Sequence, residues 1–283
     1  MSFFTYLFGK GYTGGADFSR FETFRFDLEG KQLSLSVPGS NVALSHAEMN
    51  INLPFRSPGW FEAHCEQQAN HFYITVFGDL WAYIGPFWKT AADRMFGMLS
   101  VQVAIKRTLP DKILDPDDLE TLADAIRWDY EWYFEVAEPG KYSQGKNRIA
   151  RQKAEDQYNA RHPAASEASK LRQKEGYLKN ALRELPTWFE TRCYGDQNWL
   201  YYALKREPTY PAHYYCQPLD ERYYLYVRFG YRIDLSAHFH LWQADAEAAE
   251  QRIIETVRLD FPNRLPTPDP VPMLMGKSED PRG

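Results

Sequence analysis

The side chains best suited to metal chemistry in this 283-residue sequence are four histidines and cysteines in its last third. His238 and His240 flank Phe239, so a strand that continued through them would place both imidazoles on one face. His213 and Cys216, three residues apart, offer a third ligand. The spacing is loose, and the sequence has no H-E-x-x-H or C-x-x-C motif. We favour the simpler interpretation, two histidines at a strand end, and predict no metal ligand and no cofactor.

Nucleophilic catalysis would require a cysteine or serine held beside a base. His64 and Cys65 are neighbours, and Cys193 could act with a distant histidine, but only spatial geometry defines such a pair. A cysteine more often behaves as a small buried hydrophobic residue. The G-x-S-x-G motif is absent, and the glycines at positions 9–15 match neither common phosphate-binding pattern. We therefore predict no catalytic residue and a protein that is not an enzyme.

The strongest charge pattern lies in a predicted helix at residues 116–137. Asp115 is the expected N-cap and Pro116 suits the first helical position. Apolar side chains then recur at steps of three and four, as in a buried helical stripe: Leu119, Leu122, Ile126, Tyr130, Tyr133 and Ala137. Residues 115–138 carry nine carboxylates and a single base, Arg127. Asp115, Asp117 and Asp118 match helix capping better than cation binding.

The other face of this helix is the predicted partner-binding site. Trp128 and Trp132 each follow a buried residue by two positions, which places them about 200° around the helix from the stripe. The residues expected to share that face are Asp124, Trp128, Glu131, Trp132 and Glu135. Tryptophan is a favoured anchor in interfaces, and the carboxylates would steer a basic partner. The alternative is a helix covered on both sides, with both tryptophans in the core.

Composition bounds the class of protein. The net charge of −5 argues against a direct nucleic-acid binder, and 16% aromatic residues favour strand-rich packing. Three cysteines are too few for a disulfide scaffold, which favours a reducing compartment. Residues 3–8 are apolar but lack the features of a signal peptide, and no apolar run is long enough to span a membrane. We expect a cytoplasmic protein with no membrane partner.

Alternating apolar residues predict several strands in succession, and hence an antiparallel sheet. Strands are expected at 21–37, as a hairpin that turns at Glu29 to Lys31, at 72–76, 80–88 and 99–109, and at 223–235. The last strand places Tyr223 to Leu235 at odd positions on one face and Tyr224, Arg228, Arg232 and Asp234 on the other. A helix is expected at 244–259. The predicted fold class is α+β, an antiparallel sheet packed by helices.

A basic segment interrupts this pattern. Residues 141–183 contain eleven basic and four acidic side chains, with few large apolar residues, and Pro163 divides them into two helix-compatible halves. We predict a polar, solvent-exposed helical hairpin inserted into one α+β domain at residues 16–262. Five prolines within 263–283 predict a flexible tail.

Two resemblances add to these observations. The strand from Tyr223 to Phe229, the helix at 244–259 and the opening hairpin Phe24–Pro38 resemble the closing and opening elements of PsbP-like α+β sandwiches. The acidic, aromatic-rich and motif-poor profile resembles cytoplasmic immunity proteins, such as those cognate to type VI secretion effectors. The second resemblance implies an inhibitor whose partner is a bacterial protein toxin, and it transfers no site residue.

The leading hypothesis is an immunity protein that neutralises its cognate toxin, such as a nuclease effector, by occluding the active site. The carboxylates of helix 116–137 would occupy phosphate-binding positions while Trp128 and Trp132 anchor the contact. Two alternatives stay open: a secretion chaperone or adaptor, and a metal-dependent enzyme that uses His213, His238 and His240.

Overall fold

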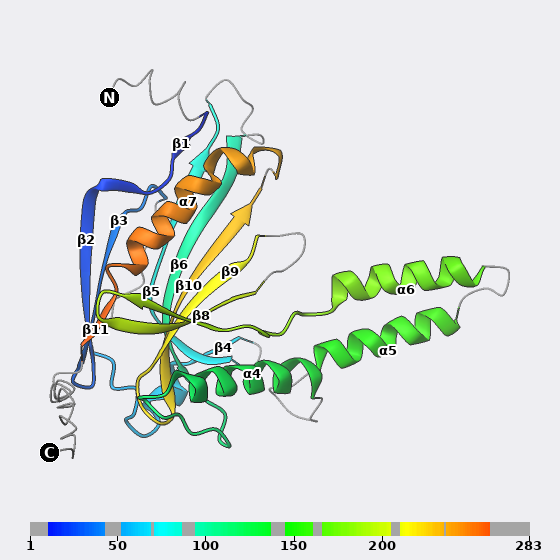
Figure 1. Ribbon diagram of the computed structural model, residues 1–283, viewed down its shortest axis with the longest axis horizontal. Coiled ribbons are helices and arrows are strands. Elements are labelled where there is room, and N and C mark those ends of the chain that lie inside the picture. The colour runs from blue at the N-terminus through cyan, green and yellow to red at the C-terminus, as the bar shows by residue number, and fades with distance from the viewer. Residues whose placement is uncertain are drawn as a thin grey trace, which may run out of the picture.

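Two antiparallel β-sheets form the centre of the fold in the computed structural model, which describes residues 11–42, 52–68, 71–86, 94–136, 145–160, 166–204, 210–234 and 236–260 (Figure 1). The main sheet has this strand order: β1 (Thr13–Gly14), β5 (His71–Ile84), β6 (Met95–Arg107), β10 (Tyr223–Ile233), β9 (Ala212–Pro218), β8 (Gln197–Leu204) and β7 (Glu190–Tyr194). Strand β4 (Glu66–Gln68) also pairs with β5. The smaller sheet has the order β11 (Arg258–Asp260), β3 (Lys31–Gly39) and β2 (Asp17–Leu28).

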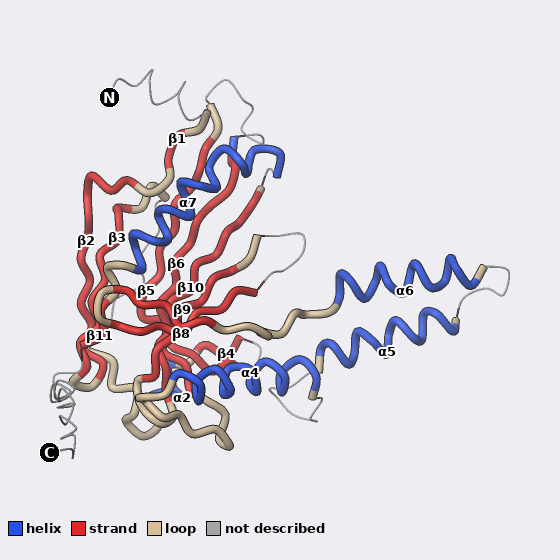
Figure 2. Tube along the Cα trace, in the orientation of Figure 1, coloured by secondary structure: helices blue, strands red, loops and turns tan. Residues whose placement is uncertain are grey.

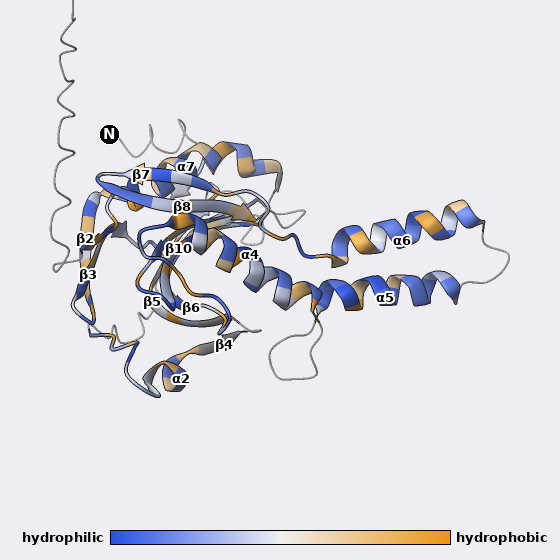
Figure 3. Ribbon diagram, turned by 60° about the horizontal axis from the view of Figure 1, so that its bottom comes forward, coloured by the Kyte–Doolittle hydropathy of each residue, from blue (hydrophilic) through white to orange (hydrophobic). Residues whose placement is uncertain are grey.

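The helices lie around the sheets and beyond them (Figure 2). They are α2 (Trp60–His64), α4 (Leu119–Glu135), α5 (Lys146–Asn159), α6 (Glu167–Ala181), α7 (Phe239–Ile254) and the 3₁₀ turn η1 (Ser236–His238). Helices α5 and α6 project away from the sheets as a hairpin, and α5 is largely hydrophilic (Figure 3). The fold is α+β, as predicted, and the predicted strand hairpin is β2–β3, with Glu29 and Gly30 at positive φ in its two-residue turn.

One face of the main sheet is sealed by the smaller sheet and by α7. The inward residues of β10, which include Leu225, Val227 and Phe229, lie in this core, as the alternation predicted. Trp242 and Ile253 of α7 pack against it. The indole Nε1 of buried Trp81 in β5 donates to the Pro38 carbonyl of β3 at 3.2 Å and so links the two sheets.

The opposite face is only partly covered, by α4. Leu122, Ile126 and Tyr130 of α4 form a second core with side chains from the central strands, among them Cys216 and Tyr226. Beneath the helix, the Lys106 ammonium forms an ion pair with Asp129, and both side chains are less than a tenth exposed. The rings of Tyr130 and Tyr224 lie 5.7 Å and 5.9 Å from the Lys106 nitrogen. This buried pair sets where α4 lies on the sheet, because neither charge is tolerated there without the other.

Helix α4 begins three residues later than the predicted N-cap implied. Asp118 is the N-cap, and its carboxylate accepts from the Glu120 amide at 2.9 Å. Asp115 instead accepts from the Asp117 amide at 2.9 Å, which makes a turn ahead of the helix. The helix ends at Glu135, where the Val136 amide bonds to the Trp132 carbonyl. A run of three aspartates offers several capping positions, so the sequence alone placed the start one turn too early.

Two other predicted boundaries were also wrong. The strands expected at 72–76 and 80–88 are one strand, β5, whose irregular pairing between Thr75 and Phe77 breaks the alternation. The helix expected at 244–259 begins at Phe239 and ends at Ile254, and residues 258–260 form β11. Helices α5 and α6 lie in the basic segment 141–183, whereas Pro163, residues 3–8 and the tail at 263–283 lie outside the described residues. In the part of the chain that is described, no helix is long and apolar enough to cross a membrane.

Replacing Asp129 with alanine is expected to lower the free energy of unfolding by about 3 kcal/mol, because it leaves the Lys106 charge buried without its partner. Asp124→Ala is the matched control, five positions away on the same helix, where the exposed carboxylate pairs with Arg127. Its cost should stay within about 0.5 kcal/mol. Urea unfolding of both variants measures the difference, and equal losses would show that the buried pair does not hold α4.

Candidate functional site

The exposed side of α4 carries three of the five predicted partner-binding residues. Asp124 and Glu131 are exposed, and Trp128 is 36% exposed. The Lys112 ammonium lies 5.2 Å from the Trp128 ring centroid, which covers part of the indole. Ile113, next to Lys112, is also exposed. These residues form a surface with a tryptophan and carboxylates on a helix whose underside is fixed to the sheet.

The other two predicted residues, Trp132 and Glu135, are half-buried near the end of α4. Glu135 accepts from Arg151 Nη2 at 3.0 Å and from the amide of Asn147 at 2.9 Å, and the Arg151 hydrogen bond lowers the pKa of its carboxyl. Buried Asn147 also donates to the Arg183 carbonyl at 2.9 Å and accepts from the Arg183 amide at 2.7 Å. Glu135, Asn147, Arg151 and the Arg183 backbone therefore form a hydrogen-bonded cluster, here called the clasp. The clasp joins α4 to both ends of the α5–α6 hairpin.

The four candidate metal ligands do not come together. His213 and Cys216, an odd number of positions apart in β9, lie on opposite faces: His213 faces α7, and Cys216 is buried beneath α4. Strand β10 ends at Ile233 and does not continue through the two histidines, as the metal alternative would require: His238 lies in η1 against the Phe96 ring, and His240 is exposed on α7. Among the described residues, no three His, Cys, Asp or Glu side chains are grouped to hold a metal ion.

His213 belongs instead to a buried hydrogen-bond cluster around Glu250 of α7. Glu250 is 2% exposed, and its carboxylate is bonded by His213 Nδ1 at 2.8 Å, Tyr215 at 2.7 Å and Tyr231 at 2.5 Å. Burial, and then the Glu250 charge, raise the pKa values of both tyrosines. The cluster fastens α7 to the sheet. A glutamate within the apolar stripe of 244–259 was the sequence signal for it, and this signal was missed.

The neighbouring residues His64 and Cys65 show no sign of an activated nucleophile. His64 Nδ1 lies 2.7 Å from the Trp60 carbonyl, and its ring stacks on the Trp60 indole. Burial raises the pKa of the Cys65 thiol, the reverse of what a thiolate nucleophile requires.

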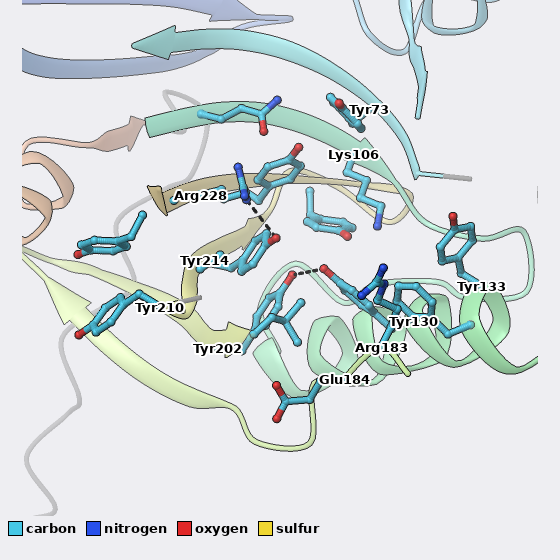
Figure 4. A pocket seen from close by; sticks show the side chains of 18 of the residues that line it. Tyr73, Lys106, Tyr130, Tyr133, Arg183, Glu184, Tyr202, Tyr210, Tyr214 and Arg228 are labelled. Carbon is cyan, nitrogen blue, oxygen red and sulfur yellow. Dashed lines mark hydrogen bonds between the residues drawn. The ribbon is translucent and has the colours of Figure 1, made fainter. Parts of the chain in front are cut away.

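A cavity of about 680 Å³ lies beside α4, on the partly covered face of the main sheet (Figure 4). Its walls come from strands β5, β6, β8, β9 and β10, from the last turns of α4 and from the base of the hairpin. Of the described residues, nine tyrosines line it: Tyr73, Tyr130, Tyr133, Tyr202, Tyr210, Tyr214, Tyr224, Tyr226 and Tyr231. The described part of the charged lining has five cationic side chains and one carboxylate: Lys106, Lys146, Arg183, Arg228, Arg232 and Glu184.

Strand register builds the cavity floor from one row of side chains. Tyr202 pairs with Tyr214, Tyr214 with Arg228, and Arg228 with Gln102, across four adjacent strands. The rings of Tyr202 and Tyr214 are stacked at 4.7 Å and 3°. Arg228 Nε donates to the Tyr214 hydroxyl at 3.2 Å, and the Tyr130 hydroxyl of α4 lies 3.4 Å from that of Tyr202.

Small residues next to this row leave the space open. Ala212 lies two positions before Tyr214, and Gly230 two positions after Arg228, so alternation places both on the cavity side. A methyl group at Gly230 would lie 2.8 Å from Ser100 Oγ and 3.3 Å from the Arg228 guanidinium. Glycine at this position therefore lets the arginine lie close to the strand.

Sequence reasoning placed Tyr224, Arg228 and Arg232 on the second face of their strand but did not identify a site there. The available signal was a strand with an apolar face and a face of tyrosine and arginine. The other walls come from residues far apart in the chain, which periodicity cannot bring together. Comparison with known protein families, curated proteins and solved structures found no match for this chain.

Buried tyrosines in this wall should make the fold sensitive to alkali. Burial raises the pKa values of Tyr130, Tyr202, Tyr224 and Tyr226 well above the ordinary 10.0. Above that pH the unfolded chain loses protons that the folded chain keeps, so the free energy of unfolding should fall by about 1.4 kcal/mol per pH unit for each such tyrosine. Urea unfolding at pH 9 to 11 measures this slope. Tyr224→Phe should reduce the slope by one tyrosine's share, and an unchanged slope would contradict the assignment.

Proposed function

We propose that this chain is a non-catalytic inhibitor of the immunity type, which binds a cognate protein toxin in the cytoplasm and occludes its active site. The observation that supports the proposal is the exposed surface of α4, where Trp128 lies between Asp124 and Glu131. Its carboxylates match a basic cleft such as that of a nuclease, where they would occupy positions used by substrate phosphates.

This surface is held rigidly in addition to having chemistry that suits a basic partner. Helix α4 is fixed from below by apolar packing and by the Lys106–Asp129 ion pair, so little order has to be gained on binding. A tryptophan with a partly exposed indole is a typical hot spot, and the surrounding charges speed association with a basic partner. Trp132 and Glu135 lie at the margin, because Glu135 already bonds to the hairpin.

A secretion chaperone or adaptor is the second candidate, and the projecting hairpin is the feature that favours it. Ile149 of α5 and Leu171 of α6 are exposed on an otherwise polar arm. An arm of this kind can hold a client without blocking the client's active site. A toxin's catalytic rate therefore separates the candidates: an inhibitor abolishes it at equimolar ratio, whereas a chaperone leaves it intact.

The proposed contact is tested with the double variant Trp128→Ala, Glu131→Ala and the purified product of the adjacent gene. Loss of a hot-spot tryptophan costs roughly 2 kcal/mol or more, so the Kd measured by calorimetry should rise at least about 30-fold. The matched control is Trp188→Ala, Glu175→Ala, which removes another exposed tryptophan and another exposed glutamate, both outside α4. Its Kd should match that of the wild type. Equal affinity of the two double variants would remove α4 from the interface.

A further inference from the structure

Arg228 is a cationic side chain of the cavity whose guanidinium is only partly bonded. It is half-buried on β10, and the one hydrogen bond that its side chain forms with the described residues runs from Nε to the Tyr214 hydroxyl at 3.2 Å. Within the described part of the chain, no carboxylate forms an ion pair with it. A guanidinium has five N–H donors in a planar fork, so both Nη groups keep their donors for a ligand. That fork fits the two oxygens of a carboxylate or phosphate.

Other charges in the cavity lining reinforce this preference. Lys106 is neutralised by Asp129, and Arg232 bonds to Asp234 at 2.8 Å. Lys146, whose ammonium lies 5.3 Å from the Tyr133 ring centroid, and Arg183 have no carboxylate partner among the described residues. Glu184 is the one carboxylate that the structure describes in the lining. The cavity therefore carries more positive than negative charge, although the whole protein is acidic.

The tyrosine walls suit a ligand with a flat ring. The Tyr202–Tyr214 stack continues toward Tyr226, whose ring centroid lies 6.3 Å from that of Tyr214. Phenol rings offer flat apolar faces, and their hydroxyls can hydrogen-bond to polar edges of a ligand. A volume of about 680 Å³ lies within the range of roughly 300–1,000 Å³ that is typical of small-molecule sites.

We propose that this cavity binds a small organic anion, a carboxylate or phosphate attached to a planar ring. Arg228 donates hydrogen bonds from its Nη groups to the oxyanion, Lys146 and Arg183 add positive charge, and the tyrosines contact the ring. The site lies on the sheet side of α4, whereas the proposed toxin contact is on the outer side. The two proposals are therefore independent, and a negative result for one does not bear on the other.

Calorimetric titration of the purified full chain with phenyl phosphate tests the proposal, with benzoate as the carboxylate probe. One saturable site per chain is expected. Arg228→Gln should weaken binding by about 10- to 100-fold, the usual effect of losing hydrogen bonds to a charged group. Arg192→Gln is the matched control: Arg192 is also half-buried on a strand over a tyrosine ring, at 3.4 Å from Tyr201, but it bonds to Glu190 and lies outside the cavity. Its affinity should equal that of the wild type.

A second variant separates loss of the binding site from misfolding of the Arg228→Gln protein. Ala212→Phe fills the cavity and keeps the arginine, so it should also abolish binding while the urea-unfolding curve stays cooperative. Inorganic phosphate alone should bind more weakly than phenyl phosphate, since it has no ring. No saturable binding of either aromatic probe to the folded wild type would overturn the proposal. The proposal would also be overturned if both cavity variants bound with wild-type affinity, or if inorganic phosphate bound as tightly as phenyl phosphate.

Discussion

The ion pair between Lys106 and Asp129 is the constraint on which the placement of α4, and with it both candidate sites, depends. It lies under α4, where water is largely excluded, so the two charges have to meet and the helix has to lie where they do. That placement turns Asp124, Trp128 and Glu131 outward and carries Tyr130 over Tyr202 on the sheet. The proposed partner-binding surface and the inner cavity wall both follow from this one placement of α4 on the sheet.

The two faces of the main sheet are covered to different extents. One face is sealed by the smaller sheet and α7, and a buried glutamate with three hydrogen-bond donors fastens the helix there. The other face carries a single covering helix, so part of the sheet keeps a lining of tyrosine and arginine instead of an apolar core. The larger apolar core therefore lies on one side of the sheet, and the described lining of the cavity lies on the other.

Sequence reasoning worked where the pattern was local. Alternation gave the inward face of β10, the positive-φ turn at Glu29 and Gly30 was visible as a Gly-containing break, and the period of three and four gave the buried stripe of α4. It failed where pairing decided the outcome. The β5 irregularity split one strand into two, and the last helix begins at Phe239 instead of the predicted Ala244. The cavity joins Tyr73, Tyr130, Arg183 and Arg228, and no spacing rule links residues so far apart.

The clasp at Asn147 has an evolutionary consequence. One buried amide bonds to Glu135 on α4 and to the Arg183 backbone where the chain returns, so the root of the hairpin is fixed by a few atoms. Beyond the root, α5 and α6 pack mainly against each other, and their remaining surface is exposed to solvent. Packing therefore constrains the residues of the root strongly and those farther along the two helices weakly. Whole helical turns can be gained or lost in pairs without disturbing the sheet, which makes the arm the part of this fold free to vary in length.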